Sequence, residues 1–290
     1  MKLTQLIKSV IVLSLLSFGS AHAASESTQI PYYGDEFYAS LANGTSNQEM
    51  LLVIKKVLRS FHAPHAGGLD ELVSSCDGRP GCYSHRAVGY DMARVILLGG
   101  YYLVNHGDSY GIRDMYCDRE RTSSEFSSNP PDFKKIPDNT VLNTEHTWPQ
   151  SRFSGRFGKD LQKSDMHHLY PTDSELNAIR GNHPFGEVTK DLKTLKCNGV
   201  SRYGYPAGGR QEVFEPPRGH RGNVARALFY FSTRYDLPIS QQEEAALRKW
   251  NKEDPVDEDE VRRNGEIFKS QGNRNPFVDY PELADLIADF

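Results

Sequence analysis

The segment spanning residues 141–184 carries the clearest local structural signals in this chain. Residues 141–142 predict a short strand that leads into a polar stretch, NTEHTWPQS. A second short strand is expected over 166–170, stopped by Pro171. The order predicted for this segment is therefore strand, connection, strand and short helix.

The expected helix in this segment has unusually well-defined ends. Thr172, with Glu175 three residues later, has the pattern of a capping box. Gly181 follows the last expected helical residue, and Pro184 blocks any continuation. The helix should therefore be about two turns long.

Helical and strand patterns alternate along the rest of the chain, which predicts an α+β fold of mixed helices and small sheets. Helical periodicity covers residues 48–61, 83–104, 224–235 and 241–250. We expect a loop with one short strand over 105–139 and small strands over 186–214. No repeat or linker marks a domain boundary, so residues 24–290 should form a single domain.

The first 23 residues have the pattern of a secretory signal peptide. Lys2 and Lys8 precede an apolar run, and small residues end at Ala23. The apolar run is much shorter than the roughly 20 residues that span a membrane. We therefore expect cleavage after Ala23 and a periplasmic or secreted protein that does not enter the membrane.

Four cysteines fit the oxidising compartment that a signal peptide implies. Three pairings are possible. A short turn-rich loop separates Cys76 from Cys82, which favours that pair and leaves Cys117 with Cys197. A zinc site is the alternative, although the spacings lack a paired CxxC motif.

The charge balance argues against global attraction to nucleic acid. The net charge of the chain is −4, and removal of residues 1–23, which hold two lysines and no acidic residue, changes it to −6. Any surface that binds phosphate must therefore be local. The strongest cationic cluster in the sequence consists of Arg218, His220, Arg221, Arg226 and Arg234.

Four side chains in and after the polar stretch suit metal-assisted attack on a phosphodiester. Imidazole titrates near physiological pH, which suits His146 as the base that deprotonates a water. Glu145 and the amide oxygen of Asn177 are hard donors of the kind that Mg²⁺ prefers. Arg180, one helical turn after Asn177, could hold a phosphate through two hydrogen bonds.

Each of these residues also has an ordinary structural explanation, such as a hydrogen-bonded histidine or a polar helix position. Neighbours on a regular strand point to opposite faces. Glu145 and His146 can therefore share a site only at a strand end or in a twisted turn, which the following Trp-Pro favours. Asp165, His167 and His168 form an additional polar cluster, in which His167 is a candidate for an orienting role.

Several long motifs, in the same order, resemble those of the bacterial endonuclease I family. The sequence reads NTEHTWPQS over 143–151 and SDMHHLYPTDSELNAIRGNHPFGEV over 164–188, with Met166 in place of the usual leucine. The likeness continues through GNVARALFYFSTRY over 222–235 and QGNRNPFVDYPEL over 271–283. It covers most of the expected mature chain.

This resemblance implies a ββα-metal nuclease core and assigns roles by position. His146 matches the general base, Glu145 and Asn177 match the metal ligands, and Arg180 matches a residue on the phosphate side. Arg152 and Arg156, which lie in a basic loop over 151–159 that also contains Lys159, remain alternatives for the phosphate contact. A carboxylate that some members carry two positions before the aspartate of the SD(L/M)H motif is replaced by Lys163 here.

The expected protein is a monomeric, Mg²⁺-dependent, sequence-nonspecific endonuclease, with Mn²⁺ or Ca²⁺ as substitute ions. It should contact the backbone phosphates of DNA and leave 5'-phosphate ends, with RNA as a further candidate substrate. An extracellular ribonuclease of the same family is one alternative. A nucleic-acid-binding protein without turnover, on the same scaffold, is another.

Overall fold

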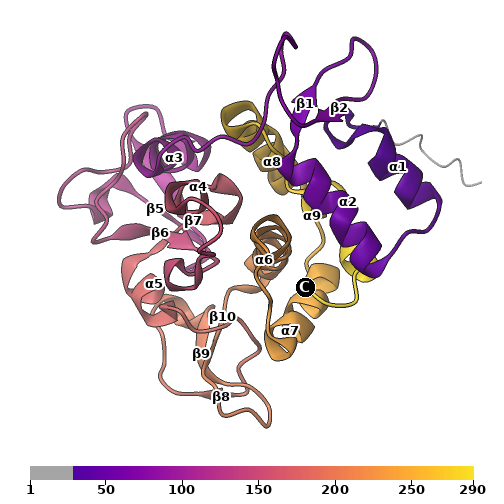
Figure 1. Cartoon of the computed structure of the whole chain (residues 1–290). Coiled ribbons are helices and arrows are strands. Elements are labelled where there is room, and N and C mark those ends of the chain that lie inside the picture. The colour runs from indigo at the N-terminus through magenta and orange to yellow at the C-terminus, as the bar shows by residue number, and fades with distance from the viewer. Residues whose placement is uncertain (1–28) are drawn as a thin grey trace, which may run out of the picture. The chain divides into compact units, whose positions relative to one another are not determined.

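Residues 29–290 are described by a computed structural model in which helices alternate with short antiparallel strands (Figure 1). The predicted signal peptide lies outside the described residues. The helices are α1 (Gly34–Ala42), α2 (Asn47–Arg59), α3 (Tyr90–Ile96), α4 (Lys159–Lys163), α5 (Ser174–Arg180), α6 (Arg221–Tyr235), α7 (Gln241–Glu253), α8 (Glu258–Gln271), α9 (Pro276–Asp279) and α10 (Leu283–Leu286). The α+β class predicted from the sequence is confirmed.

The strands of the described residues form four small antiparallel sheets. They are β1 (Phe61–Ala63), β2 (Glu71–Val73), β3 (Leu103–Asn105), β4 (Tyr110–Asp114), β5 (Arg119–Arg121), β6 (Leu142–His146), β7 (Leu169–Asp173), β8 (Lys190–Asp191), β9 (Arg202–Tyr205) and β10 (Val213–Glu215). Two of the sheets have two strands each, β1 with β2 and β6 with β7. The other two have three strands each, in the orders β3-β4-β5 and β10-β9-β8.

Helix α6 lies at the centre of the unit formed by residues 31–290 (Figure 1). It contacts α2, α7 and α9. It also contacts the 3-10 turn Met166–His168, which precedes β7. Because α6 is enclosed by these elements, its side chains are buried from Val224 to Tyr235. The helix therefore fixes the distance between the β6–β7 pair and the C-terminal helices.

The predicted cationic cluster does not form a basic surface. Arg226 and Arg234 are buried on α6, and the Nη2 atom of Arg226 lies 2.5 Å from Glu260 of α8. Arg221 pairs with Glu215. Arg221 and Arg226 therefore have acidic partners within the protein, whereas Arg218 is exposed. Helix α6 also begins at Arg221, before the 224–235 range that the periodicity predicted.

The helix predicted over 83–104 is shorter than expected. Gly89 precedes α3 with a φ of 81°, a conformation that interrupts helical backbone before Tyr90. After Ile96 the chain continues as a π-helix, Leu97–Tyr101. Within it, a Cβ atom on Gly99 would lie 2.5 Å from the carbonyl oxygen of Lys135, so glycine permits this close approach.

Two details around the β6–β7 pair differ from the prediction. Residues 166–168 form a 3-10 turn, and β7 runs through Pro171, whose carbonyl accepts a hydrogen bond from the Met115 amide at 2.9 Å. A strand tolerates proline where no N–H donor is needed. The N-cap of α5 is Asp173, the last residue of β7, rather than Thr172, because the Asp173 carboxylate accepts hydrogen bonds from the backbone amides of Glu175 and Leu176.

The region 105–139 contains more strand than predicted. Strand β4 pairs on one side with β3 and on the other with β5. These three short strands reinforce one another by backbone pairing between neighbours, which the polar composition of the region does not reveal. Both favoured disulfides are present, Cys76 with Cys82 and Cys117 with Cys197.

Candidate active site

A polar pocket of about 510 Å³ lies at the end of β6 and beside α5. It brings together Glu145, His146 and Asn177, three of the four site residues predicted from the sequence. Its complete lining is Tyr90, Asn143, Thr144, Glu145, His146, Pro149, Gln150, Ser151, Asn177, Gly181 and Asn182. The lining holds one carboxylate, four side-chain amides and three hydroxyl groups.

Glu145 and His146 lie at the end of a strand, where two neighbouring side chains can face the same site. Glu145 pairs with Tyr170 in the β6–β7 register, and His146, the last residue of β6, pairs with Leu169. The strand stops there, and the chain turns through Pro149 into a short 3-10 helix that carries Gln150. Both neighbours consequently line one pocket.

Glu145 is a buried carboxylate held by one strong partner. Its side chain is about 2% exposed, and Nη1 of Arg180 donates to Oε1 at 2.6 Å. Burial raises the pKa of Glu145 to about 6, while Arg180 and the nearby Tyr116 hydroxyl act in the opposite direction. A second cation close to this carboxylate would further favour its ionised form.

His146 is held in one tautomer by the main chain. Its Nε2 atom lies 3.1 Å from the carbonyl oxygen of Lys163, which can only accept, so Nε2 carries the proton. The amide nitrogen of Gln150 donates to Nδ1 over 3.4 Å. Burial, followed by the proximity of His168 and of the Lys163 charge, lowers the pKa of His146 well below its usual range. The ring is therefore neutral at physiological pH, with a lone pair on Nδ1.

Asn177 lies on α5 and is partly exposed at the pocket. Within residues 29–290 its side chain makes no hydrogen bond to another protein group. The next turn of the same helix carries Arg180. The amide oxygen is therefore available to a ligand in the pocket.

Arg180 is buried beneath the pocket instead of lining it. Its side chain is about 1% exposed. Beyond its bond to Glu145, Nη1 donates to the carbonyl oxygen of His146 at 2.8 Å, and Nη2 donates to that of Thr147 at 2.5 Å. The guanidinium also stacks over Phe185 at 4.3 Å. This placement favours a role in positioning the end of β6 over the direct phosphate contact predicted from the sequence.

The two adjacent histidines point in different directions, and His168 rather than the predicted His167 lies beside the site. The His168 and His146 ring centroids are 5.3 Å apart. His167 donates through Nε2 to the Asn273 carbonyl, and Asp165 accepts from the buried hydroxyls of Tyr230 and Tyr235. This second network anchors the turn before β7 to α6 and to the C-terminal region.

The basic loop after the polar stretch contributes little to the pocket. Arg152 stacks over Trp148 at 4.9 Å and lies 3.6 Å from the buried Glu243. Arg156 and Lys159 are exposed and do not line the pocket. Neither of the alternative arginines lines the pocket, and the phosphate contact predicted for them stays a prediction.

Sequence reasoning gave no role to Gln150 and Tyr90, two pocket residues that lie beside His146. Gln150 lies within the polar stretch NTEHTWPQS, so its proximity to His146 had a detectable signal. Tyr90 comes from α3, more than 50 residues earlier. Its ring lies 5.2 Å from that of His146, a contact that only the fold creates.

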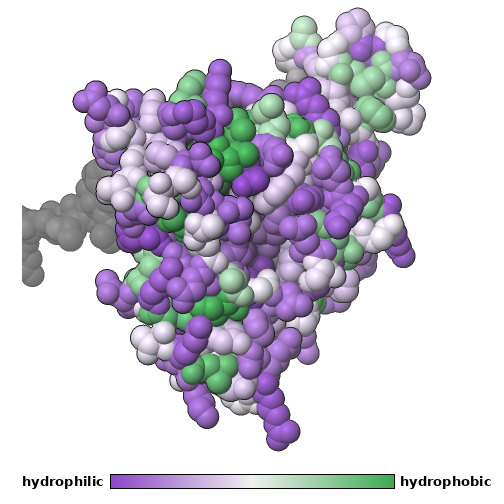
Figure 2. Space-filling view, turned by 90° about the vertical axis from the view of Figure 1, so that its left-hand side faces the viewer, coloured by the Kyte–Doolittle hydropathy of each residue, from purple (hydrophilic) through white to green (hydrophobic). Residues whose placement is uncertain are grey.

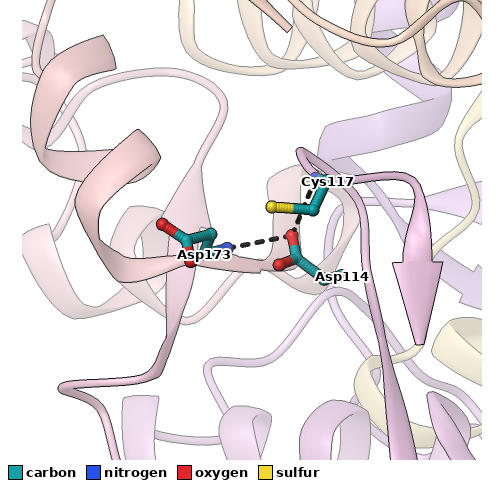
Figure 3. Close-up of side chains that lie close together, drawn as sticks. All are labelled: Asp114, Cys117 and Asp173. Atoms are coloured by element: carbon teal, nitrogen blue, oxygen red, sulfur yellow. Dashed lines mark hydrogen bonds between the residues drawn. The ribbon is translucent and has the colours of Figure 1, made fainter. Parts of the chain in front are cut away.

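Another group of potential metal ligands lies near the start of α5, formed by Asp114, Cys117 and Asp173 (Figure 3). The Cys117 sulfur is part of a disulfide, so it is not a free thiolate. Arg121 pairs with both aspartates. The Asp114 carboxylate also accepts from the Asp173 amide at 3.0 Å. These contacts explain the cluster as a structural network around the cap of α5.

The face seen in Figure 2 is mainly hydrophilic, with hydrophobic residues in separate patches. A surface of this kind does not present a broad apolar docking area. Among the described residues, no helix is both long and apolar enough to cross a membrane.

The sequence is similar to a family of known proteins. The Endonuclease I family model matches residues 83–282. An extracellular ribonuclease of Bacillus amyloliquefaciens is 38% identical over 166 residues, which cover 50% of this chain and 53% of the relative. A periplasmic deoxyribonuclease of Aeromonas hydrophila is 33% identical over 128 residues, which cover 43% of this chain and 51% of the relative.

An Endonuclease-1 of Buchnera aphidicola is 33% identical over 117 residues, covering 40% of this chain and 44% of the relative. The chain thus spans about half the length of the curated relatives that it matches. The matched family region contains β6, β7, α5 and every residue that lines the pocket. The chain belongs to the endonuclease I family.

Proposed function

We propose that this protein is a periplasmic or secreted, Mg²⁺-dependent endonuclease that hydrolyses DNA without sequence preference. The observation that carries the proposal is the convergence of Glu145, His146 and Asn177 on one polar pocket. In this proposal, β6, β7 and α5 form the ββα-metal core. The extracellular or periplasmic names of the relatives support the compartment.

The donor set of the pocket fits a hard divalent cation. Glu145 offers a carboxylate, and Asn177 offers an amide oxygen that makes no hydrogen bond to any group within residues 29–290. Mg²⁺ commonly binds through few protein ligands and keeps several waters. When bound, it would polarise the scissile phosphate and stabilise charge on the leaving oxygen. Mn²⁺ and Ca²⁺ have similar ligand preferences and are candidate substitutes.

His146 acts as the general base in this proposal. The Lys163 carbonyl fixes the proton on Nε2, so Nδ1 is the atom that accepts a proton from the attacking water. The lowered pKa keeps this nitrogen unprotonated at physiological pH. Attack in line with the 3'-oxygen leaving group gives a 5'-phosphate and a 3'-hydroxyl.

Arg180 serves as a positioning residue in this scheme. It holds Glu145 and the carbonyl groups of His146 and Thr147 at the same time. These contacts fix the backbone at the point where β6 ends. A preorganised site of this kind keeps the base and the carboxylate at a constant separation.

Sequence preference should be weak, because contacts to backbone phosphates carry no base information. RNA is the second candidate substrate, since two relatives are named extracellular ribonucleases. The test is a Mg²⁺ titration of the purified mature chain on plasmid DNA and on a long RNA in parallel. Cleavage in EDTA, or no cleavage of either polymer in Mg²⁺, would contradict the proposal.

A further inference from the structure

We propose that Lys163 supplies the cation that binds a substrate phosphate beside the pocket, the role that the sequence suggested for Arg180. This inference rests on the proposed nuclease function and deepens it. It assigns a substrate contact to a residue at a position where other members of the family can carry a carboxylate. Three observations lead to it.

Lys163 is placed next to the base by both its backbone and its side chain. Its carbonyl oxygen accepts the hydrogen bond from His146 Nε2 at 3.1 Å. Its Nζ atom lies 4.5 Å from the ring centroid of Tyr90, a pocket residue. The Tyr90 ring is in turn 5.2 Å from that of His146. The ammonium therefore lies on the side of His146 where Tyr90 forms the pocket wall.

The charge of Lys163 is not neutralised by the protein. Within residues 29–290, no carboxylate oxygen lies within about 4 Å of its Nζ atom, the usual limit for an ion pair. The other cations around the site have acidic partners. Arg180 pairs with Glu145 at 2.6 Å, Arg94 with Asp91 at 3.3 Å, and Arg152 lies 3.6 Å from Glu243. Unlike these three arginines, Lys163 has no acidic partner in the part of the chain that the structure describes, so its charge is available to an anion.

The contact with Tyr90 restricts the position of the Lys163 ammonium group beside the pocket. A cation over an aromatic face is attracted by the ring quadrupole, with an energy of about 0.5–1 kcal/mol at exposed sites. Lys163 is partly buried, which limits the rotamers open to its stem. The ammonium is therefore held near the pocket, while its remaining donors can face a phosphate oxygen as a point charge.

The substrate class follows from this chemistry. A lysine recognises the charge of a phosphate and not the identity of a base. We infer that Lys163 contacts a backbone phosphate of the strand being cut, at or next to the scissile position. Its contribution should be equal for any sequence and should weaken as salt rises.

The test measures binding separately from cleavage. A fluorescein-labelled DNA duplex of mixed sequence is titrated with wild-type protein, Lys163→Met and Lys163→Arg in EDTA at several salt concentrations. Lys193→Met is the matched control, because Lys193 is exposed and does not line the pocket. Every variant at position 163 keeps the backbone carbonyl that holds His146.

We expect Lys163→Met to weaken binding roughly tenfold at low salt and to reduce the slope of log affinity against log salt by about one. Lys163→Arg should keep both values close to wild type, and Lys193→Met should change neither. Equal affinity and slope for Lys163→Met and wild type would overturn the inference. Plasmid cleavage by the wild-type protein in Mg²⁺ is scored separately, so loss of that activity contradicts the proposed function and not this contact.

Discussion

Arg180 and Glu145 form an ion pair beneath the pocket, with Nη1 and Oε1 2.6 Å apart and both side chains almost fully buried. The same guanidinium donates to two successive backbone carbonyl groups, those of His146 and Thr147. One side chain therefore neutralises the carboxylate and fixes the end of β6. The pair connects the stability of the fold to the geometry of the site.

Removing one member of this pair should destabilise the protein strongly. Arg180→Met leaves the Glu145 carboxylate buried without its partner, a change that typically costs about 3–5 kcal/mol. The pKa of Glu145 should rise further, because Arg180 favours its ionised form. Urea unfolding at pH 7.5 measures the loss. A change in unfolding free energy below about 0.5 kcal/mol, the range of ordinary surface substitutions, would show that the pair is not structurally important.

Asn177→Ala should weaken Mg²⁺ binding with little effect on the stability of the fold. The Asn177 side chain has no protein hydrogen bond among the described residues, so its loss should change stability by less than about 0.5 kcal/mol. Affinity for Mg²⁺, measured by calorimetry without nucleic acid, should fall at least about tenfold, as for loss of a metal-ligand contact. Gln242→Ala, an amide on α7 outside this pocket, is the control. Unchanged Mg²⁺ affinity in Asn177→Ala would remove Asn177 from the proposed ligand set.

The two disulfides should differ in their contribution to stability. Cys117 and Cys197 are 80 residues apart and enclose β6, β7 and α5, whereas Cys76 and Cys82 are 6 residues apart. Loop-closure entropy predicts a loss of about 4.5 kcal/mol for the first bond and about 2 kcal/mol for the second. Urea unfolding of the two double Cys→Ser variants tests this order. A larger loss from the Cys76–Cys82 bond would contradict it.

Buried His220 should make the protein sensitive to acid. Burial lowers the pKa of His220 from 6.5 to about 3, so below pH 6.5 the unfolded chain binds a proton that the folded chain does not. The stabilisation is full above pH 6.5 and is lost as the pH falls toward 3, at up to about 1.4 kcal/mol per pH unit.

His220→Phe should reduce this dependence, because the ring packs against Tyr170 and neither ring nitrogen makes a hydrogen bond of standard geometry within the described residues. The measurement is the unfolding free energy between pH 7.5 and pH 5.0. His65→Gln, at an exposed histidine, is the control. If the unfolding free energy of His220→Phe falls with pH as steeply as that of the wild type, His220 is not the source of the acid sensitivity.

Local signals in the sequence predicted the parts of this molecule that depend on neighbours in the chain. Helix α5 ends at Gly181 as expected, since glycine adopts the positive φ found there. The strand-end position of the Glu-His pair also followed from local geometry, because alternation along a regular strand would have separated the two side chains.

Contacts between residues distant in the sequence could not be predicted from local patterns. Arg180 had the residue type and spacing of a phosphate contact, but its guanidinium turns inward because Glu145 and two carbonyl groups converge on it. Arg226 likewise pairs with Glu260, 34 residues away. Tyr90 reaches the pocket only because α3 packs beside the β6–β7 region. None of these contacts leaves a periodic or compositional trace.

The most direct test of the proposed mechanism is single-turnover cleavage of labelled DNA by wild-type protein and by His146→Ala at saturating Mg²⁺. Mg²⁺ binding and thermal unfolding are measured on the same samples. The proposal predicts that His146→Ala loses at least about 100-fold in cleavage rate, the scale of general-base catalysis, while it keeps a cooperative unfolding transition and the metal affinity of the wild type. Cleavage by His146→Ala at the wild-type rate would contradict the assignment of His146 as the base.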